Sequence, residues 1–357
     1  MTELLSPAEA VAHAARLSQA SFIPSYPSIM SSEMGSVLAR NDIRMVEFES
    51  QSSAISAAIG ASTIGRRVFI PLASPQSISD FYSASFQRLP IVASNVSQCL
   101  ATYTARSDMN DILVLRDAGW IILLAENNQE ILDSIIMAYR ISEEVLLPSI
   151  ININGIQLRE PVAVPGDKKI LNFLKKLSPM KLDFKKPTAF NPPVEDYMEF
   201  KAQQQKAMDN ALSTATKVCN KWKEKFGRSY SAVDSYLLDD ADYAFVVAGS
   251  NSATCRAVVN KLRTDGEKVG MLRIRMLRPF PKNGITESLK NLKKVAIVDE
   301  NISLGSSGII YTELVQYYHG FACDFIAGLG RYLTERDFVE IFQRLKSSDT
   351  SERSWLL

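Results

Sequence analysis

The segment that gives the first indication of the fold is rich in small residues: Phe48-Glu49-Ser50-Gln51-Ser52-Ser53-Ala54-Ile55-Ser56-Ala57-Ala58-Ile59-Gly60-Ala61-Ser62. The pattern predicts a helix over residues 50–64 with Ser50 at its N-cap. Alanines recur at the i, i+3, i+4, i+7 spacing of one helix face. Such a face lets a neighbouring backbone or a cofactor ring approach closely. Tight packing of the helix on a sheet accounts for it equally well, and the two readings are compatible.

Short apolar runs and helical patterns alternate around this segment. Strands are predicted over residues 67–72, 89–94, 120–125 and 145–152, and a second helix over residues 128–141. Another helix begins at Ser6, because Pro7 and Glu9 follow it in the positions of a capping box. Alternation of this kind is typical of an α/β domain with a mostly parallel sheet covered on both faces.

Residues 159–194 differ in character, since prolines and lysines dominate them. Such a composition favours a solvated connector, and a docking arm for an acidic partner subunit is the alternative. A long amphipathic helix is predicted to follow over residues 195–226, with Gly227 just beyond its end.

A second α/β unit is expected after the long helix. Strands are predicted over residues 243–248, 272–276 and 294–299, and a helix over residues 253–261. The strand at residues 272–276 alternates in polarity, which predicts one wet face. We therefore expect two domains, residues 1–235 and 236–340, the second a small parallel sheet with right-handed crossovers, followed by a tail at residues 341–357.

Composition excludes several classes of protein. The 357 residues include 40 Lys and Arg against 39 Asp and Glu, a formal charge of +1, which argues against a nucleic-acid or membrane-surface role. The four cysteines stand far apart and the two histidines are isolated, so no metal site is predicted. The N-terminus lacks a signal-peptide pattern, and no apolar run approaches about 18 residues. We expect a cytoplasmic protein without membrane segments.

Five collinear motifs carry a family resemblance. Residues 48–62 resemble the "E-S-E-H-S-A-x-S-A-x-I-G-A-S" motif of the α subunit of pyruvate:ferredoxin oxidoreductase (pyruvate synthase) and related 2-oxoacid:ferredoxin oxidoreductases. Residues 116–130, 226–230, 269–281 and 298–305 resemble "R-D-x-G-W … E-N-x-Q-E", "F-G-R-x-Y", "V-G-L-L-K-I-R-x-F-R-P-F-P" and "L-D-R-N-I-S-F-G". The resemblance implies a pyrimidine-side thiamine-diphosphate-binding-like domain followed by a smaller transketolase C-terminal-like domain.

The sequence differs from the family motifs at positions that contact the cofactor or the substrate in the family. Gln51 stands where the family has the glutamate that hydrogen-bonds N1′ of the cofactor, and an amide cannot deliver a proton there. Beside Ser28, Ile29 replaces a threonine that contacts the 2-oxoacid, and Gln98 falls on or near the substrate-binding arginine. The loop resembling "T-S-S-Q-G-L", residues 73–78, lacks the family's glycine.

Two residues could compensate for these departures. Arg106, a few residues beyond Gln98, is a possible substitute cation for the missing arginine, although a solvated loop arginine is the other reading. Glu49, two residues before Gln51, is a candidate for the missing carboxylate, but it precedes the N-cap and is expected to point elsewhere.

The resemblance implies an enzyme subunit. The family oxidatively decarboxylates a 2-oxoacid to acyl-CoA with coenzyme A and ferredoxin, or runs the reverse synthase reaction. This chain has no diphosphate or cluster motif. Thiamine diphosphate with Mg²⁺ and the iron–sulfur clusters are therefore expected mainly on partner chains, a β subunit with γ and δ subunits or domains, and none on this chain alone. The alternative is a non-catalytic paralogue with a scaffold or regulatory role, which the three substitutions favour.

Overall fold

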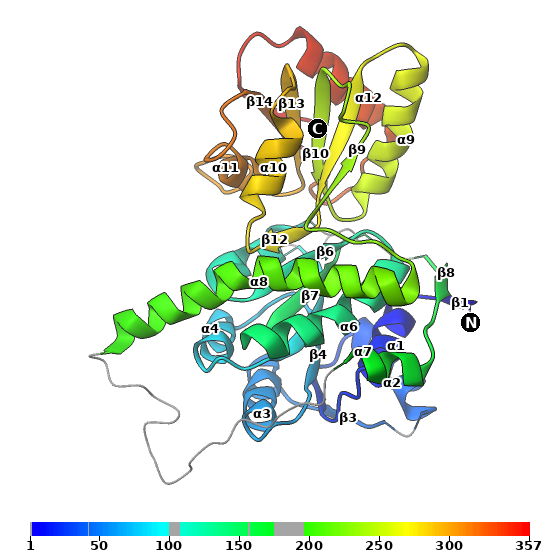
Figure 1. Ribbon diagram of the computed structural model, residues 1–357, viewed down its shortest axis with the longest axis vertical. Coiled ribbons are helices and arrows are strands. Elements are labelled where there is room, and N and C mark those ends of the chain that lie inside the picture. Colours follow the sequence, from blue (N-terminus) through cyan, green and yellow to red (C-terminus); the bar gives the residue numbers. More distant parts are fainter. Residues whose placement is uncertain (1, 42, 100–107, 156–157, 175–195) are drawn as a thin grey trace.

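Two mainly parallel sheets organise the chain (Figure 1), in a computed structural model that describes residues 2–41, 43–99, 108–155, 158–174 and 196–357. The first sheet has the strand order β12-β6-β7-β5-β4 and the second the order β15-β14-β13-β10-β11-β9. In the first, β4 (Phe69–Ala73), β5 (Val92–Val96), β7 (Ser149–Ile153) and β6 (Ile121–Ala125) are parallel, and β12 (Met276–Arg278) joins β6 antiparallel. The expected mixed α/β class with parallel sheets is confirmed.

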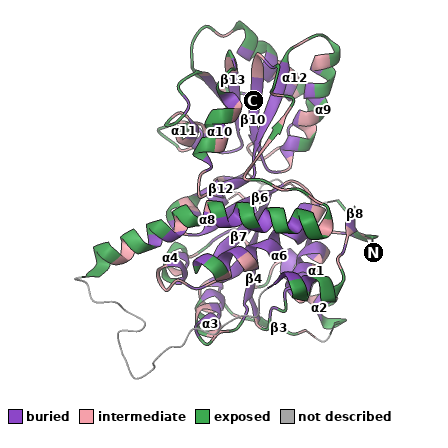
Figure 2. Ribbon diagram, viewed as in Figure 1, coloured by how far each residue is buried: buried purple, intermediate pink, exposed green. Residues whose placement is uncertain are grey.

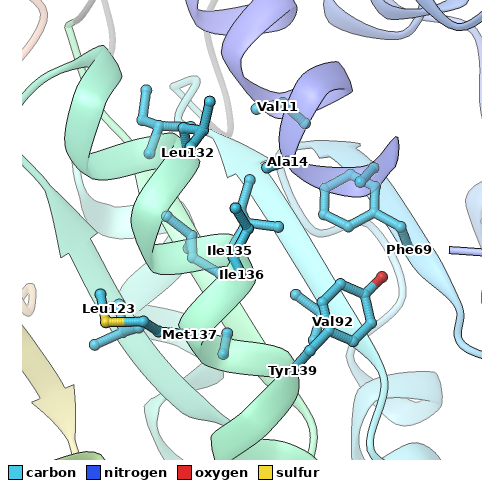
Figure 3. Packing of buried hydrophobic residues seen from close by; sticks show 14 of the residues in the cluster. Val11, Ala14, Phe69, Val92, Leu123, Leu132, Ile135, Ile136, Met137 and Tyr139 are labelled. Carbon is cyan, nitrogen blue, oxygen red and sulfur yellow. The ribbon is translucent and has the colours of Figure 1, made fainter. Parts of the chain in front are cut away.

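Helices cover both faces of the first sheet. One face carries α1 (Pro7–Leu17), α2 (Ile29–Ala39), α6 (Asn128–Val145), α7 (Asp167–Phe173) and α8 (Tyr197–Phe226). The other face carries α3 (Gln51–Thr63), α4 (Ile78–Phe86), α5 (Asn110–Leu113) and the 3₁₀ turn η1 (Val114–Asp117). Figure 3 shows side chains of α1 and α6 meeting those of the sheet around Phe69 and Val92. The predicted capping box at Ser6 and Glu9 starts α1.

The second sheet is doubly wound. It comprises β9 (Val233–Tyr236), β10 (Tyr243–Ala248), β11 (Val269–Ile274), β13 (Lys294–Asp299), β14 (Phe321–Ile326) and β15 (Arg353–Trp355), all parallel except β9. Helices α9 (Asn251–Thr264) and α12 (Glu335–Ser347) pack on one face, while α10 (Lys282–Leu289) and α11 (Ile309–Leu314) pack on the other. Two small sheets, β1 (Thr2–Leu5) with β8 (Glu160–Ala163) and β2 (Ile23–Ser25) with β3 (Met45–Glu47), complete the fold.

One of the three apolar clusters of the described residues is shared by the two units. A single cluster runs from Ile55 of α3 through Trp120 and the first sheet to Ile285 of α10 and Ile309 of α11. In Figure 2 the strands of both sheets are mainly buried, and exposed residues lie on the outer helices. The chain also crosses between the sheets, because β11 belongs to the second sheet and β12, two residues later, to the first. Among the described helices, none is both long and apolar enough to cross a membrane.

Three expectations need correction. Residues 272–276 have no wet face, since Arg273 and Arg275 are buried in ion pairs with Glu130 of α6. The described part of the 159–194 connector is folded into β8 and α7, while the lysines from residue 175 onward lie outside the described residues. Residues 341–357 are not a tail, because they complete α12 and add β15 to the edge of the second sheet. Pairing between residues far apart in the sequence, which local patterns do not record, explains the buried arginines and the strands β8 and β15.

Glu300 joins the two units through a buried carboxyl. Its Oε2 accepts a hydrogen bond of 2.8 Å from the Nδ2 group of Asn154, which follows β7 of the first sheet. Burial raises the pKa of Glu300 to about 7, although hydrogen bonds from Asn251 and Asn154 act in the opposite direction. The carboxyl is therefore largely protonated in the folded chain at pH values where an unfolded chain would ionise it.

This pKa predicts a pH-dependent stability. The stabilising contribution of Glu300 is fully present below its ordinary pKa of 4.5 and is lost as the pH rises to about 7. The loss amounts to about 1.4 kcal/mol per pH unit at most. Glu300→Gln should remove this part of the slope in urea-unfolding free energies measured from pH 4.5 to 8. Glu224→Gln, on the exposed side of α8, serves as the control. Parallel curves for wild type and Glu300→Gln would contradict the prediction.

Candidate active site

A pocket of about 260 Å³ opens at the carboxyl edge of the first sheet. Because β2, β4 and β5 are parallel to their neighbours, the residues that follow them meet at this edge. The pocket is lined by Tyr26, Pro27, Ser28, Ile29, Gln51, Pro71, Ala73, Gln76 and Gln98. The structure thus brings together all four residues that the sequence indicated, Ser28, Ile29, Gln51 and Gln98, from positions up to 70 residues apart.

Gln51 lies at the start of α3 and is only 2% exposed. Its Nε2 group donates a hydrogen bond of 2.9 Å to the carbonyl oxygen of Ser74, and its Oε1 accepts one of 2.7 Å from the backbone N–H of Gln76. The amide thereby closes the loop between β4 and α4. A carboxylate can only accept, so glutamate at this position would lose the contact with Ser74. Of the amide's two N–H groups and two oxygen lone pairs, these contacts use one each.

Glu49 does not replace the missing carboxylate. It accepts a hydrogen bond from the Ser53 hydroxyl in the first turn of α3, and the described pocket lining does not include it. That hydrogen bond, together with a backbone one, lowers the pKa of Glu49. Its position outside the helix agrees with the role of Ser50 as N-cap, whose side chain accepts from Ser53 N–H at 3.1 Å.

Ser28 and Ile29 form the rim contributed by α2. The Ser28 hydroxyl caps this helix by accepting from the Ser31 N–H at 3.0 Å, and the Ser31 hydroxyl accepts from the Ser28 N–H at 2.8 Å. The next residue, Ile29, is 82% exposed. An exposed isoleucine at the rim of a pocket provides apolar surface for contact with a ligand.

Gln98 carries an exposed side chain just beyond β5, and its backbone N–H donates to Asp111 Oδ2 at 3.1 Å. Arg106, the suggested substitute cation, falls outside the described residues. Of the described residues that line the pocket, none bears a charge. Across the part of the chain that the structure describes, no three His, Cys, Asp or Glu side chains gather as metal ligands would.

Sequence reasoning missed three contributors to the site. Gln76 lines the pocket from the loop that resembles the family's "T-S-S-Q-G-L", and this loop was the available signal. Ser77, in place of the family's glycine, has φ −126°, a conformation open to any residue. Asn95 and Asp111 lie behind the pocket and carry no motif, so no signal in the sequence pointed to them.

The fold resembles that of two solved structures. A 2-oxoglutarate:ferredoxin oxidoreductase from Magnetococcus marinus superposes with a TM-score of 0.74 at 14% identity, over 96% of this chain and 65% of that chain. A split-gene transketolase in an inactive β4 tetramer superposes with a TM-score of 0.58 at 13% identity, over 96% of this chain and 98% of that chain. At these identities the likeness concerns the fold alone.

Sequence comparison shows the family. Residues 13–220 match the model "Pyruvate flavodoxin/ferredoxin oxidoreductase, thiamine diP-bdg", and residues 241–338 match "Pyruvate:ferredoxin oxidoreductase core domain II". Pyruvate synthase subunit PorA of Methanothermobacter thermautotrophicus is 34% identical, over 98% of this chain and 96% of that protein. Ketoisovalerate oxidoreductase subunit VorA of Pyrococcus horikoshii is 35% identical, over 85% of this chain and 82% of that protein. The chain belongs to the α-subunit family of the 2-oxoacid:ferredoxin oxidoreductases, as its motifs indicated.

Proposed function

We propose that this chain is the α subunit of a thiamine-diphosphate-dependent 2-oxoacid:ferredoxin oxidoreductase. The observation that carries the proposal is the convergence of Ser28, Ile29, Gln51 and Gln98, each at a family site position, on one pocket. The reaction is the oxidative decarboxylation of a 2-oxoacid to acyl-CoA with ferredoxin as electron acceptor, or its reverse. The proposed partners are a β subunit that holds the diphosphate, Mg²⁺ and an iron–sulfur cluster, together with γ and δ subunits or domains.

The pocket fits an aminopyrimidine in part. The unused N–H and lone pair of the Gln51 amide allow hydrogen bonds to a ring nitrogen and its amino group, so binding is compatible with this wall. When bound, thiamine diphosphate supplies the carbon nucleophile for attack on the 2-oxo group. Gln51 would hold the ring by hydrogen bonds but would not move a proton to or from it, because an amide does not titrate. Ile29 contributes an apolar wall, while Ser28 and Gln98 lie where polar groups of the substrate would approach.

A second candidate function rests on the same residue. The Gln51 amide closes the loop between Ser74 and Gln76, a task that a carboxylate would do less well. In a non-catalytic paralogue with a scaffold or regulatory role, residue 51 would be expected to stabilise the loop and not to take part in catalysis. A neighbouring gene for a second α-like chain with the glutamate in place would favour this candidate.

Reconstitution tests the proposal. The purified chain alone is expected to show no iron–sulfur absorbance and to bind thiamine diphosphate more weakly than micromolar. Co-production with a β subunit should give a complex that reduces ferredoxin when a 2-oxoacid and coenzyme A are supplied. Micromolar or tighter cofactor binding by the lone chain would contradict the proposed division of ligands. A stable complex inactive toward all 2-oxoacids would support the paralogue.

The uncharged pocket predicts a substrate preference. With Ile29 at the rim and no charge among the described lining residues, the complex should prefer a bulky apolar 2-oxoacid over pyruvate. Apolar contacts of this size change kcat/KM by about 10- to 200-fold. The measurement is kcat/KM for 2-oxoisovalerate, phenylglyoxylate and pyruvate, and Ile29→Thr should shift the preference toward pyruvate. Faster turnover of pyruvate than of both larger substrates would refute the prediction.

A further inference from the structure

A buried polar network lies between Gln51 and Gln98, on two sides of the pocket. Its centre is formed by Asn95 of β5 and Asp111 of α5, both with 0% exposure. The Nδ2 group of Asn95 donates to Asp111 Oδ2 at 3.1 Å and to Asn152 Oδ1 at 2.8 Å. Asn152 Oδ1 also accepts from the Ser97 hydroxyl at 3.0 Å, so both residues belong to the same network.

From Asn95 the network leads to Gln51. The Oδ1 atom of Asn95 accepts from the Ser74 N–H at 2.9 Å, while the Ser74 carbonyl accepts from Gln51. Ser74 has φ 61°, a left-handed conformation that a residue other than glycine adopts only when its surroundings enforce it. Two side-chain amides, Asn95 behind and Gln51 in front, hold this residue and hence the loop that carries Gln76.

From Asp111 the network leads to Gln98. Oδ2 of Asp111 accepts from the Gln98 N–H at 3.1 Å, and Oδ1 accepts from the Ile112 N–H at 2.7 Å. Burial raises the pKa of Asp111 to about 6, while hydrogen bonds from Asn95, Gln98, Ser97 and Ile112 act against that rise. A buried carboxylate that accepts several N–H groups binds each more strongly than a neutral acceptor would.

The same short helix also contacts the second unit. Next to Asp111, the Asn110 side chain accepts from the Ile302 N–H at 3.1 Å, and the Met109 N–H donates to the Glu300 carbonyl at 2.9 Å. Asn110 therefore contacts the second unit, while the neighbouring Asp111 contacts the backbone of Gln98 in the pocket wall. Both contacts help to hold α5 in place.

We propose that Asp111 is a positioning residue of the pocket, which through Asn95 and the Gln98 backbone sets the places of Gln51, Gln76 and Gln98 relative to one another. Its importance for catalysis rests on the proposed function, but the positioning itself does not. Asparagine is not an adequate replacement, because in either orientation of its amide an N–H group would face another donor.

Hydrogen–deuterium exchange on the full chain tests the proposal without cofactor or substrate. Asp111→Asn should speed exchange at the amides of Ser74, Gln76 and Gln98 by about 10- to 100-fold, with exchange in β6 and β7 unchanged. The double variant Asn95→Asp/Asp111→Asn swaps the carboxylate and the amide, so the pair can bond in reverse and protection should return at Ser74 and Gln76. The Gln98 N–H still faces an amide N–H at position 111 and should remain unprotected. Asp133→Asn, which breaks the buried contacts with Arg228 and Tyr230, is the matched control and should spare the three amides.

Two results would overturn the proposal: an exchange increase spread evenly over the first sheet, or no recovery at Ser74 and Gln76 in the double variant. Selective loss and recovery would support it even if the reconstituted complex proved inactive toward every 2-oxoacid. In that case only the proposed function would fail.

Discussion

The Gln51→Glu variant of the assembled complex should exchange the C2 proton of bound thiamine diphosphate about 10²- to 10⁴-fold faster than wild type. The reason is that a carboxyl group can share a proton with the ring nitrogen N1′, whereas the amide of Gln51 cannot. The rate is measured by NMR after transfer into D₂O and quenching at timed intervals. The gain is expected despite a structural cost, since glutamate no longer donates to the Ser74 carbonyl.

Gln98→Glu is the matched control for this experiment. It introduces the same carboxylate into the same pocket from the segment beyond β5, and its exchange rate should stay at the wild-type level. If Gln51→Glu and wild type exchange at equal rates, then Gln51 does not lie at the cofactor or the chain does not serve a thiamine site.

Glu130→Gln is expected to lower the free energy of unfolding by about 3–5 kcal/mol, because it removes the carboxylate that pairs with the buried Arg275. Arg273 keeps its ion pair with Glu126 at 3.1 Å. Glu130 is 2% exposed and accepts from both Arg273 and Arg275. Burial would raise the pKa of Glu130, yet the two guanidinium groups hold it below its ordinary value. The pair links α6 of the first unit to β11 and the residue after it, so its loss loosens the contact between the two sheets.

Urea unfolding monitored by circular dichroism measures the effect. The control is Glu340→Gln, which makes the same chemical change in the exposed Glu340–Arg344 pair of α12 and should shift stability by about 0.5 kcal/mol at most. A Glu130→Gln variant within about 1 kcal/mol of wild type would show that the buried pair adds little to stability.

Local sequence patterns determined several elements of this chain. Ser6 and Glu9 start α1 as predicted, the segment 50–64 forms α3 at Gln51–Thr63, and β10 and β13 have the predicted bounds. The family motifs also pointed to Gln51, Ser28, Ile29 and Gln98, which line one pocket. The caps and strand bounds depend on neighbours within a few residues, which the sequence shows directly. The pocket residues lie near the carboxyl ends of parallel strands, and these ends meet at one edge of a sheet.

Only the tertiary structure decided what each polar side chain binds. Arg273 and Arg275 alternate with apolar residues in the sequence, as in a strand with one solvent-exposed face. In the structure both are buried, because they donate hydrogen bonds to Glu130, more than 140 positions away in the sequence. Asp111 and Asn95 carry no motif, and their importance arises because two loops and a short helix meet behind the pocket. The family motif indicates a cofactor contact for Gln51, and only the folded chain shows that its amide also bonds the backbone groups of Ser74 and Gln76. A hydrogen bond needs its donor and acceptor within about 3 Å of each other, and only the folded chain sets that distance.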